Sequence, residues 1–181
     1  MVDFHAFATN ENTLLVSKIA TVASIGIYAG TSLSFNTIIM PALRKFSSSS
    51  SVAIWNETVN AARAGQFASA VLAVLGGAGL YYGSKNASYL YSAASMFLTI
   101  PYTALVIQSV DNKLFEIRHN NTVNGKSNSM KDSKSEDGEA DSLLKRWNLL
   151  HAGRTVLGLG ALLTTVYGIV SDSGVRFIIF K

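Results

Sequence analysis

Residues 19–43 read IATVASIGIYAGTSLSFNTIIMPAL and contain no charged side chain. An α-helix needs about 20 mainly apolar residues to cross the hydrocarbon core of a bilayer, so this stretch is long enough for one transmembrane span. Three further stretches without a charge follow at 64–84, 86–110 and 155–171. Together they predict an all-α fold, an integral membrane four-helix bundle.

The amino-acid composition agrees with a membrane protein. Hydrophobic residues make up 49% of the 181 residues and charged residues only 14%, against about 25% charged in an ordinary soluble domain. All of the charged residues lie outside the four uncharged stretches, which excludes an ordinary soluble globule. The first stretch follows the acidic residues Asp3 and Glu11 and is longer than the core of a signal peptide, so we expect an uncleaved first span.

We expect one domain, residues 1–181, with spans at about 16–40, 63–84, 87–110 and 147–171. The last uncharged stretch is too short to cross the bilayer, so the fourth span must extend backward through His151 and Trp147. A short interfacial helix at 52–62 should lead into the second span. Residues about 119–141 are rich in Asn, Ser, Lys and acids and have almost no apolar content, which predicts a disordered cytoplasmic loop.

Small residues and a proline predict how the spans pack and bend. Gly26, Gly30 and Ser34 recur at every fourth position of the first span, a spacing that allows a neighbouring helix to approach closely. Pro101 deprives the carbonyl of Phe97 of its helical donor, so we expect a bend in the third span.

The distribution of Lys and Arg predicts the orientation in the membrane. Four spans put both termini and the turn at Lys85 on one side and the two longer loops on the other. The first side carries four Lys and Arg residues and the second eleven. Loops rich in Lys and Arg stay in the cytoplasm, so we expect a multi-pass protein with both termini on the non-cytoplasmic side. The sequence does not indicate which organelle.

Several classes of function are excluded or disfavoured. The chain has no cysteine, which excludes disulfides, thiolate metal sites, iron–sulfur clusters and a cysteine nucleophile. Its net charge of +4 is explained by membrane orientation, so the expected partner is membrane lipid and not nucleic acid. His5 and His119 lie in the tail and the loop, so we expect neither a haem nor a metal site.

Polar residues gather at the ends of the spans that face the longer loops, and the topology predicts that they converge. They are Asn36, Arg63, Gln66, Gln108, Asp111, Asn112, Trp147, His151 and Arg154. Trp147, His151 and Arg154 are spaced by four and then three residues, which places them on one helical stripe. Ionisable residues at membrane depth are costly and usually face partners or cavities, so each is a functional hypothesis.

Each of these residues also has a structural interpretation. Arg63 and Arg154 can anchor the helices in the lipid headgroups, and Trp147 can belong to the interfacial aromatic belt. The pair at 111–112 can simply cap a helix. His151 differs, because an arginine one turn away favours the neutral imidazole, which can accept a proton.

The opening of the last span, Trp147-Asn-Leu-Leu-His151-Ala-Gly-Arg154, resembles the W-x-x-x-H-x-x-R signature of the anthrone oxygenase-like membrane proteins of fungi. The third span carries similar motif elements, Pro101-Tyr-Thr and Asp111-Asn-Lys-Leu114. The first half of the chain also matches at Gly30, Ser34, Pro41 and Trp55. The chain departs from the family at Ser109-Val110-Asp111, where proline-threonine or similar is expected before the asparagine, and so adds a carboxylate near any substrate pocket.

The resemblance implies a monooxygenase of fungal secondary metabolism, an oxidoreductase that converts a polyketide anthrone to an anthraquinone. It implies molecular oxygen and a hydrophobic aromatic small molecule as substrates, with no flavin, haem, metal or other cofactor. His151 would be the general base and Arg154 the stabiliser of the oxyanion. The implied substrate-binding residues are Trp147, Tyr102, Asn112, Asp111 and Arg63.

Two other functions compete with this one. The first is a non-catalytic membrane scaffold, a lipid-binding protein or an assembly partner with the same fold, since a fold does not establish a function. The second, a transporter or channel, is less favoured because the chain has no internal repeat and no charge deep inside an uncharged stretch. The sequence makes no prediction of the oligomeric state.

Overall fold

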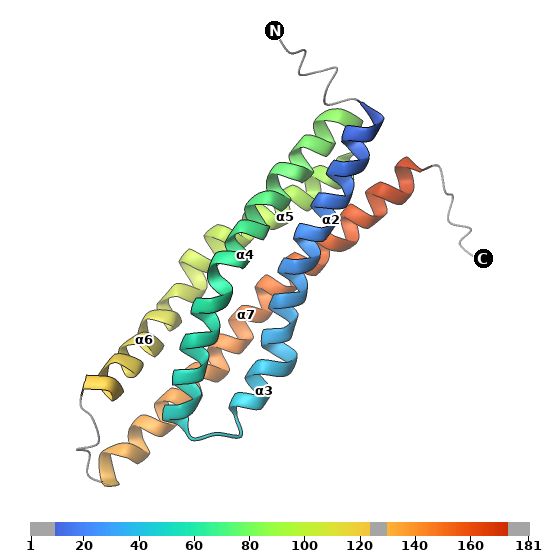
Figure 1. The fold of residues 1–181 in the computed structure, drawn as a ribbon. Coiled ribbons are helices and arrows are strands. Elements are labelled where there is room, and N and C mark those ends of the chain that lie inside the picture. The colour runs from blue at the N-terminus through green and yellow to red at the C-terminus, as the bar shows by residue number, and fades with distance from the viewer. Residues whose placement is uncertain (1–9, 124–129, 174–181) are drawn as a thin grey trace. The chain divides into compact units, whose positions relative to one another are not determined.

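The computed structural model describes residues 10–123 and 130–173, and its long elements are all helices. Two of the helical segments are π-helices, written η1 and η2. Along the chain (Figure 1) the order is α2 (Glu11–Ser34), η1 (Phe35–Ile39), α3 (Met40–Leu43), α4 (Ser48–Ser84), α5 (Ala87–Tyr102), η2 (Thr103–Ile107), α6 (Gln108–Val123) and α7 (Met130–Asp172).

Four continuous helices are long and apolar enough to cross a membrane. They cover Glu11–Leu43, Ser48–Ser84, Ala87–Asn120 and Gly138–Asp172, and each contains one of the predicted spans. Large apolar side chains such as Leu105, Leu149 and Leu163 are more than two thirds exposed, as expected where lipid replaces water around a helix. The predicted fold class is confirmed: the chain is an all-α, multi-pass integral membrane protein with four spanning helices.

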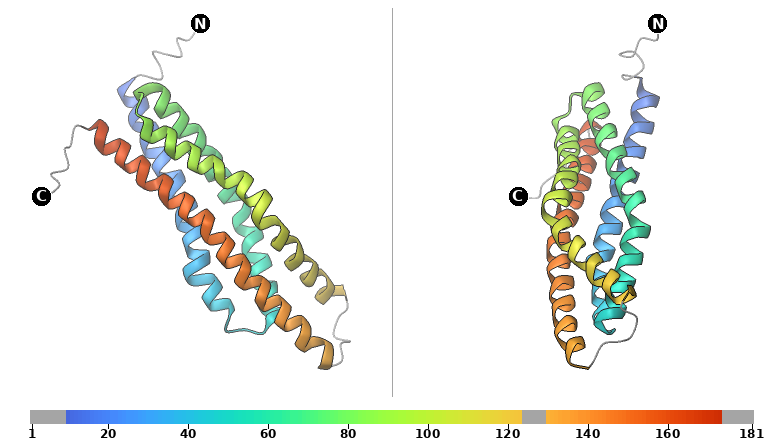
Figure 2. Two further views of the ribbon diagram at one scale, coloured as in Figure 1. Left: turned by 180° about the vertical axis from the view of Figure 1, so that it is seen from behind. Right: turned by 90° about the vertical axis from the view of Figure 1, so that its left-hand side faces the viewer.

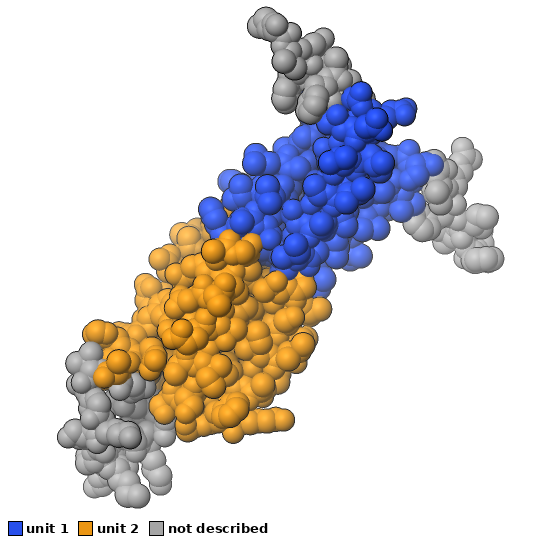
Figure 3. Space-filling model, in the orientation of Figure 1, with its two compact units in different colours: residues 1–29, 67–99, 156–181 blue, residues 30–66, 100–155 orange. Residues whose placement is uncertain are grey.

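The chain divides into two compact units, shown in blue and orange in Figure 3. Unit 1 comprises residues 1–29, 67–99 and 156–181, and unit 2 comprises residues 30–66 and 100–155. Each unit has its own buried core. The core of unit 1 contains Ile25, Tyr28, Ala70, Ala73, Met96 and Ala161. The core of unit 2 is rich in aromatic and large aliphatic side chains, namely Phe35, Met40, Leu43, Val52, Trp55, Ile107, Val110, Leu114, Leu143, Leu144 and Trp147.

Close packing in unit 1 uses other glycines than the ones expected from the sequence. A Cβ atom built on Gly26 would meet nothing within 4 Å, and the same holds for Gly30 in unit 2. A Cβ on Gly158 would instead lie 3.0 Å from the ring of Tyr28. The spacing of small residues therefore identified a smooth helical face correctly but not the face against which a neighbour packs, because several faces of these helices carry glycine.

A tight hairpin joins α4 and α5 in unit 1, as predicted, and both views of Figure 2 show it. Lys85 has φ 59°, the left-handed conformation that commonly ends a helix. Asn86 then caps α5, because its Oδ1 accepts a 3.0 Å hydrogen bond from the backbone N–H of Ser88. The turn therefore needs just two residues outside the helices.

The helices of the structure extend further than the sequence predicts. α4 runs without a break from Ser48, so residues 52–62 are helical as expected and continue directly into the second span. The stretch expected to be disordered, about 119–141, is helical up to Val123 and again from Met130, while residues 124–129 lie outside the described part. The start of α7 owes its helical structure to Ala140, Leu143 and Leu144, which bury in the core of unit 2 at helical spacing.

Both prolines of the chain lie next to a π-helix. Pro41 follows η1 and Pro101 precedes η2. In each π-helix a backbone N–H bonds to the carbonyl five residues earlier, from Met40 to Phe35 and from Gln108 to Thr103. The predicted irregularity at Pro101 thus takes the form of a widened turn directly after the proline. Such π-turns are rare and frequently occur at functional sites.

Candidate functional site

His151 lies in the interior of unit 2 and is 1% exposed. Its Nδ1 atom lies 3.2 Å from Oδ1 of Asn36, which belongs to η1. The same Asn36 oxygen accepts a 2.7 Å hydrogen bond from the hydroxyl of Thr155. On its other side, Nδ2 of Asn36 donates to the backbone carbonyl of Asn148 at 2.8 Å and to the side-chain oxygen of Asn148 at 2.8 Å.

These contacts fix the tautomer of the imidazole. The backbone carbonyl of Asn148 can only accept, so the amide nitrogen of Asn36 must face it and the amide oxygen must face His151. That oxygen also only accepts, so Nδ1 of His151 carries the proton. In the neutral ring, Nε2 is therefore the nitrogen that has a lone pair and can act as a base.

An aromatic cluster surrounds the imidazole. The ring of Trp147 stacks on His151, with centroids 4.5 Å apart and an interplanar angle of 19°. The ring of Phe35 lies 5.4 Å from His151 and meets Trp147 edge to face. Trp55 packs edge to face on Trp147 from a further side. The cluster gives the histidine an apolar setting on these sides.

Asp111 holds the plane of Trp147. The indole Nε1 of Trp147 donates a 2.7 Å hydrogen bond to Oδ1 of Asp111, and both side chains are buried. An indole has one donor and no acceptor, so this bond fixes the ring orientation against His151. The carboxylate of Asp111 therefore orients the indole ring of Trp147.

Arg154 lies one helical turn after His151, and its Nη2 donates a 3.1 Å hydrogen bond to Oε1 of Gln66 on α4. Residues three apart on a helix share a face, with Cβ atoms about 5–6 Å apart. The arrangement therefore places a cation and a carboxamide beside the base.

The other predicted site residues contact groups other than the imidazole. The hydroxyl of Tyr102 donates 2.9 Å to the backbone carbonyl of Leu150, and its ring packs against Gly153. The guanidinium of Arg63 sits 5.6 Å from the ring of Phe115, on the outside of the aromatic cluster. Asn112 is exposed on α6. The structure thus brings His151, Trp147, Asp111 and Arg154 into one network, in which the charge of Arg63 also acts on Asp111. Tyr102 and Asn112 lie around it.

The contributors to the network that were not among the predicted site residues include Asn36, Gln66, Phe35 and Thr155. Asn36 was recognised only as a polar span end, although an asparagine inside an uncharged stretch is a usable signal. Phe35 and Thr155 carry no local signal, because apolar and hydroxyl residues are common throughout the spans. Their contribution depends on tertiary contacts alone.

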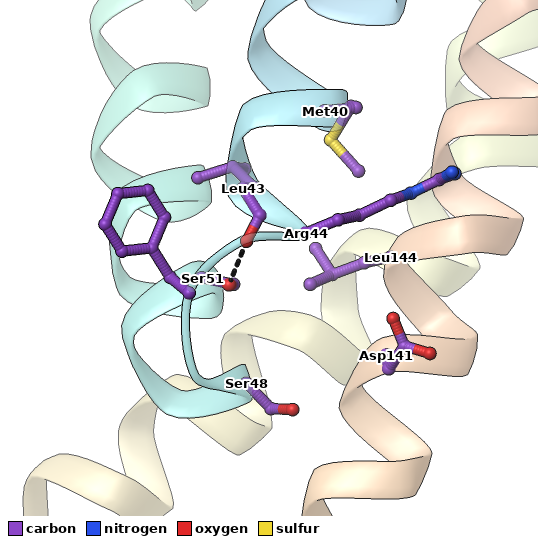
Figure 4. Close-up of a pocket in the computed structure, with 8 residues that line it drawn as sticks. Met40, Leu43, Arg44, Ser48, Ser51, Asp141 and Leu144 are labelled. Carbon is purple, nitrogen blue, oxygen red and sulfur yellow. Dashed lines mark hydrogen bonds between the residues drawn. The ribbon is translucent and has the colours of Figure 1, made fainter.

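A small pocket of about 30 Å³ lies elsewhere in unit 2, at the loop between α3 and α4 (Figure 4). Its lining consists of Met40, Leu43, Arg44, Phe46, Ser48, Ser51, Asp141 and Leu144. The hydroxyl of Ser51 donates a 2.7 Å hydrogen bond to the carbonyl of Leu43 at its edge. The space suffices for a few water molecules at most, so we do not place an aromatic ligand there.

The network offers a base, a cation and amide groups. Among the side chains that the structure describes, no three His, Asp or Glu residues are grouped so that they could hold a metal ion. In this arrangement, Arg154 and the hydrogen-bond donors are the groups able to stabilise a negative charge.

Residues 55–164, more than half of the chain, match the family model described as Anthrone oxygenase. The matched region contains Gln66, Asp111, Trp147, His151 and Arg154, while Asn36 precedes it. No curated protein and no solved structure matches the chain.

Proposed function

The chain belongs to the anthrone oxygenase family, and from this premise we propose that it oxidises a hydrophobic anthrone to the corresponding anthraquinone with molecular oxygen. The observation that carries the proposal is the 3.2 Å contact between Nδ1 of His151 and Oδ1 of Asn36. With the Asn36 amide oriented by the backbone carbonyl of Asn148, this contact assigns the proton to Nδ1 and leaves Nε2 as the basic nitrogen. A buried base beside a cation suits a reaction that begins with loss of a proton from carbon.

The proposed reaction balances with dioxygen as the electron acceptor and needs no separate electron carrier. The central CH2 of an anthrone loses a proton to give an anion that is also an aromatic phenolate. This anion adds to dioxygen, so a C–O bond forms and dioxygen is reduced to a peroxide anion on that carbon, which takes the first proton back from the base to give a hydroperoxide. Loss of the second C–H proton then breaks the O–O bond and forms the new carbonyl. The leaving hydroxide takes up this second proton and departs as water. One oxygen atom ends in the quinone and the other in water.

The residues of the network fit separate parts of this reaction. His151 removes the first proton, a contribution typically worth about 100-fold to 10,000-fold in rate. Arg154 stabilises the oxygen on which negative charge develops. Trp147 and Phe35 offer flat apolar surfaces to a planar substrate, and Asp111 keeps Trp147 in place.

The substrate must reach a base that is almost fully buried. A fused-ring anthrone dissolves in lipid, and the helices expose apolar side chains to lipid, Leu149 among them. We therefore infer that the substrate enters from the bilayer when the aromatic side chains around His151 separate.

The site is further proposed to face the cytoplasm, with both termini on the other side of the membrane. The support is the excess of Lys and Arg, eleven against four, in the two longer loops. The bilayer itself would deliver the substrate.

The test is oxygen uptake by the purified protein in detergent with a panel of anthrones. We expect His151→Ala to lower the rate about 100-fold or more. His119→Ala is the matched control, because His119 is exposed on α6 and outside the network. Equal rates for the wild type and His151→Ala would refute the mechanism.

The close packing of His151 favours a second candidate function. His151 is 1% exposed and hydrogen-bonded to Asn36, so it can also serve only to hold α7 against η1. The protein would then be a non-catalytic scaffold, a lipid-binding protein or an assembly partner. In that case, His151→Ala would lower membrane accumulation or thermal stability, and no anthrone would stimulate oxygen uptake by the wild type.

A further inference from the structure

Gln66 has a buried donor without a partner in the part of the chain that the structure describes. Its side chain is 7% exposed, and the unpaired atom is Nε2. Its other atom, Oε1, accepts from Nη2 of Arg154 at 3.1 Å. A guanidinium has donors and no acceptor, so the amide cannot be turned around without losing this contact.

A buried donor in this position requires an acceptor. Nearly all buried polar groups in proteins are hydrogen-bonded, and each exception needs an explanation. The unpaired N–H of Gln66 is therefore best explained by a ligand that brings an oxygen.

We propose that the Nε2–H group of Gln66 and the guanidinium of Arg154 together bind the carbonyl oxygen of a flat aromatic ketone. This inference rests on the proposed function, and it assigns the oxygen-binding half of the site. As the ketone becomes a phenolate, both donors face the oxygen that gains the charge, and such donors stabilise it most where water is excluded.

The spacing of the helix supports one ligand that spans both halves. His151 and Arg154 are three residues apart on one face of α7, with Cβ atoms about 5–6 Å apart. The reacting CH2 and the carbonyl of an anthrone lie at opposite corners of a single six-membered ring. One such ring can therefore present its CH2 to His151 and its oxygen to the pair of Gln66 and Arg154.

The experiment measures equilibrium binding under anaerobic conditions, so that nothing is oxidised. The probes are anthrone and 9,10-dihydroanthracene, which has the same three rings but no oxygen. We expect the wild-type protein to bind anthrone about tenfold more tightly, the effect of one well-placed hydrogen bond to a buried donor. Gln66→Glu should abolish this preference and leave dihydroanthracene binding unchanged.

Gln66→Glu separates the donor role from a structural role. Glutamate keeps an acceptor for Arg154 but has no N–H, so a residue that only holds Arg154 would tolerate it. Gln66→Met is a second variant without a donor and should lose the preference too. Gln108→Glu is the matched control, because Gln108 is exposed on α6, and it should bind both probes as the wild type does.

Several results would overturn the inference. One is a wild-type protein that binds both probes equally or binds neither. Another is that both Gln66 variants keep the preference for anthrone, or that they weaken the binding of both probes equally.

Measurements of oxygen uptake distinguish failure of this binding site from failure of the proposed function. A preference for anthrone that depends on Gln66, without oxygen uptake, supports this site and refutes catalysis. Oxygen uptake by the wild type, together with unchanged anthrone affinity in both Gln66 variants, supports catalysis and refutes this site.

Discussion

The Nδ1 atom of His151 lies 3.2 Å from the Oδ1 atom of Asn36, although 115 residues separate them in the chain. The contact joins the middle of α7 to the π-turn η1. The backbone carbonyl of Asn148, on the same helix as His151, fixes the orientation of the Asn36 amide. The backbone of α7 therefore determines, through Asn36, which nitrogen of the imidazole carries the proton.

Removing Asn36 should release the imidazole. In Asn36→Ala, the Nδ1–H loses its acceptor, so both tautomers become populated and the basic nitrogen is no longer held in one place. We expect the rate of anthrone oxidation to fall about tenfold to 100-fold, the effect of losing one buried hydrogen bond. Nitrogen NMR of labelled histidine should show the proton shared between Nδ1 and Nε2.

Asn148→Ala is the control for this change. It removes one acceptor of the Asn36 amide but leaves the backbone carbonyl that orients it, so Nδ1 should stay protonated and the rate should stay near that of the wild type. If Asn36→Ala keeps both the wild-type tautomer and the wild-type rate, Asn36 does not position the base.

A polar cluster in unit 1 should stabilise the protein without affecting the chemistry. Asp172 pairs with Lys18 at 2.7 Å and accepts hydrogen bonds from Asn86 at 2.8 Å and from the hydroxyl of Tyr89 at 2.7 Å. We expect Asp172→Ala to lower the free energy of unfolding by about 2 kcal/mol, because three partly buried partners lose their acceptor. Thermal unfolding in detergent measures the effect.

The matched control is Asp141→Ala in unit 2. Asp141 also pairs with a lysine, Lys145 at 2.6 Å, but both side chains are about half exposed. Exposed pairs of this kind contribute about 0.3–0.5 kcal/mol, so the unfolding temperature should hardly change. Equal losses in the two variants would show that the burial of the Asp172 cluster is unimportant.

Two glycines on α7 should respond in opposite ways to alanine. A methyl group on Gly158 would lie 3.0 Å from the ring of Tyr28, which is 1% exposed and cannot move aside, so Gly158→Ala should cost about 1–3 kcal/mol. A methyl group on Gly160 meets nothing within 4 Å, so Gly160→Ala should be neutral or slightly stabilising. Thermal unfolding of the two variants side by side checks this packing.

The orientation can be mapped directly because the chain has no cysteine. Ser49 and Ala87 are exposed at the ends of α4 and α5, and Ser49→Cys and Ala87→Cys each add one thiol. If the protein lies in the plasma membrane of intact cells, a membrane-impermeant maleimide should label Ala87→Cys directly and Ser49→Cys only after permeabilisation. If it lies in an organelle, sealed vesicles with the cytoplasmic face outward should show direct labelling of Ser49→Cys, and labelling of Ala87→Cys only after permeabilisation. The reverse pattern would refute the proposed orientation.

The spans were predictable from the sequence because charged side chains are excluded from the bilayer core, so each span appears as a stretch without charged residues. The stripe of Trp147, His151 and Arg154 was also predictable, since helical periodicity alone puts these residues on one face. The role of Asn36 was not, because it depends on a π-turn and on a carbonyl 112 residues away. The helix at Ala140 was missed because few buried side chains anchor an otherwise polar segment.

The π-turn η1 has a consequence for the comparison of related sequences. A π-turn is an α-helix with one extra residue in a turn, and each residue of an α-helix advances the side chains by about 100°. A relative with one residue fewer between Ser34 and Met40 would keep a continuous helix but turn its counterpart of Asn36 away from the histidine. Insertions and deletions, and not substitutions alone, would therefore decide in which relatives the asparagine still orients the histidine.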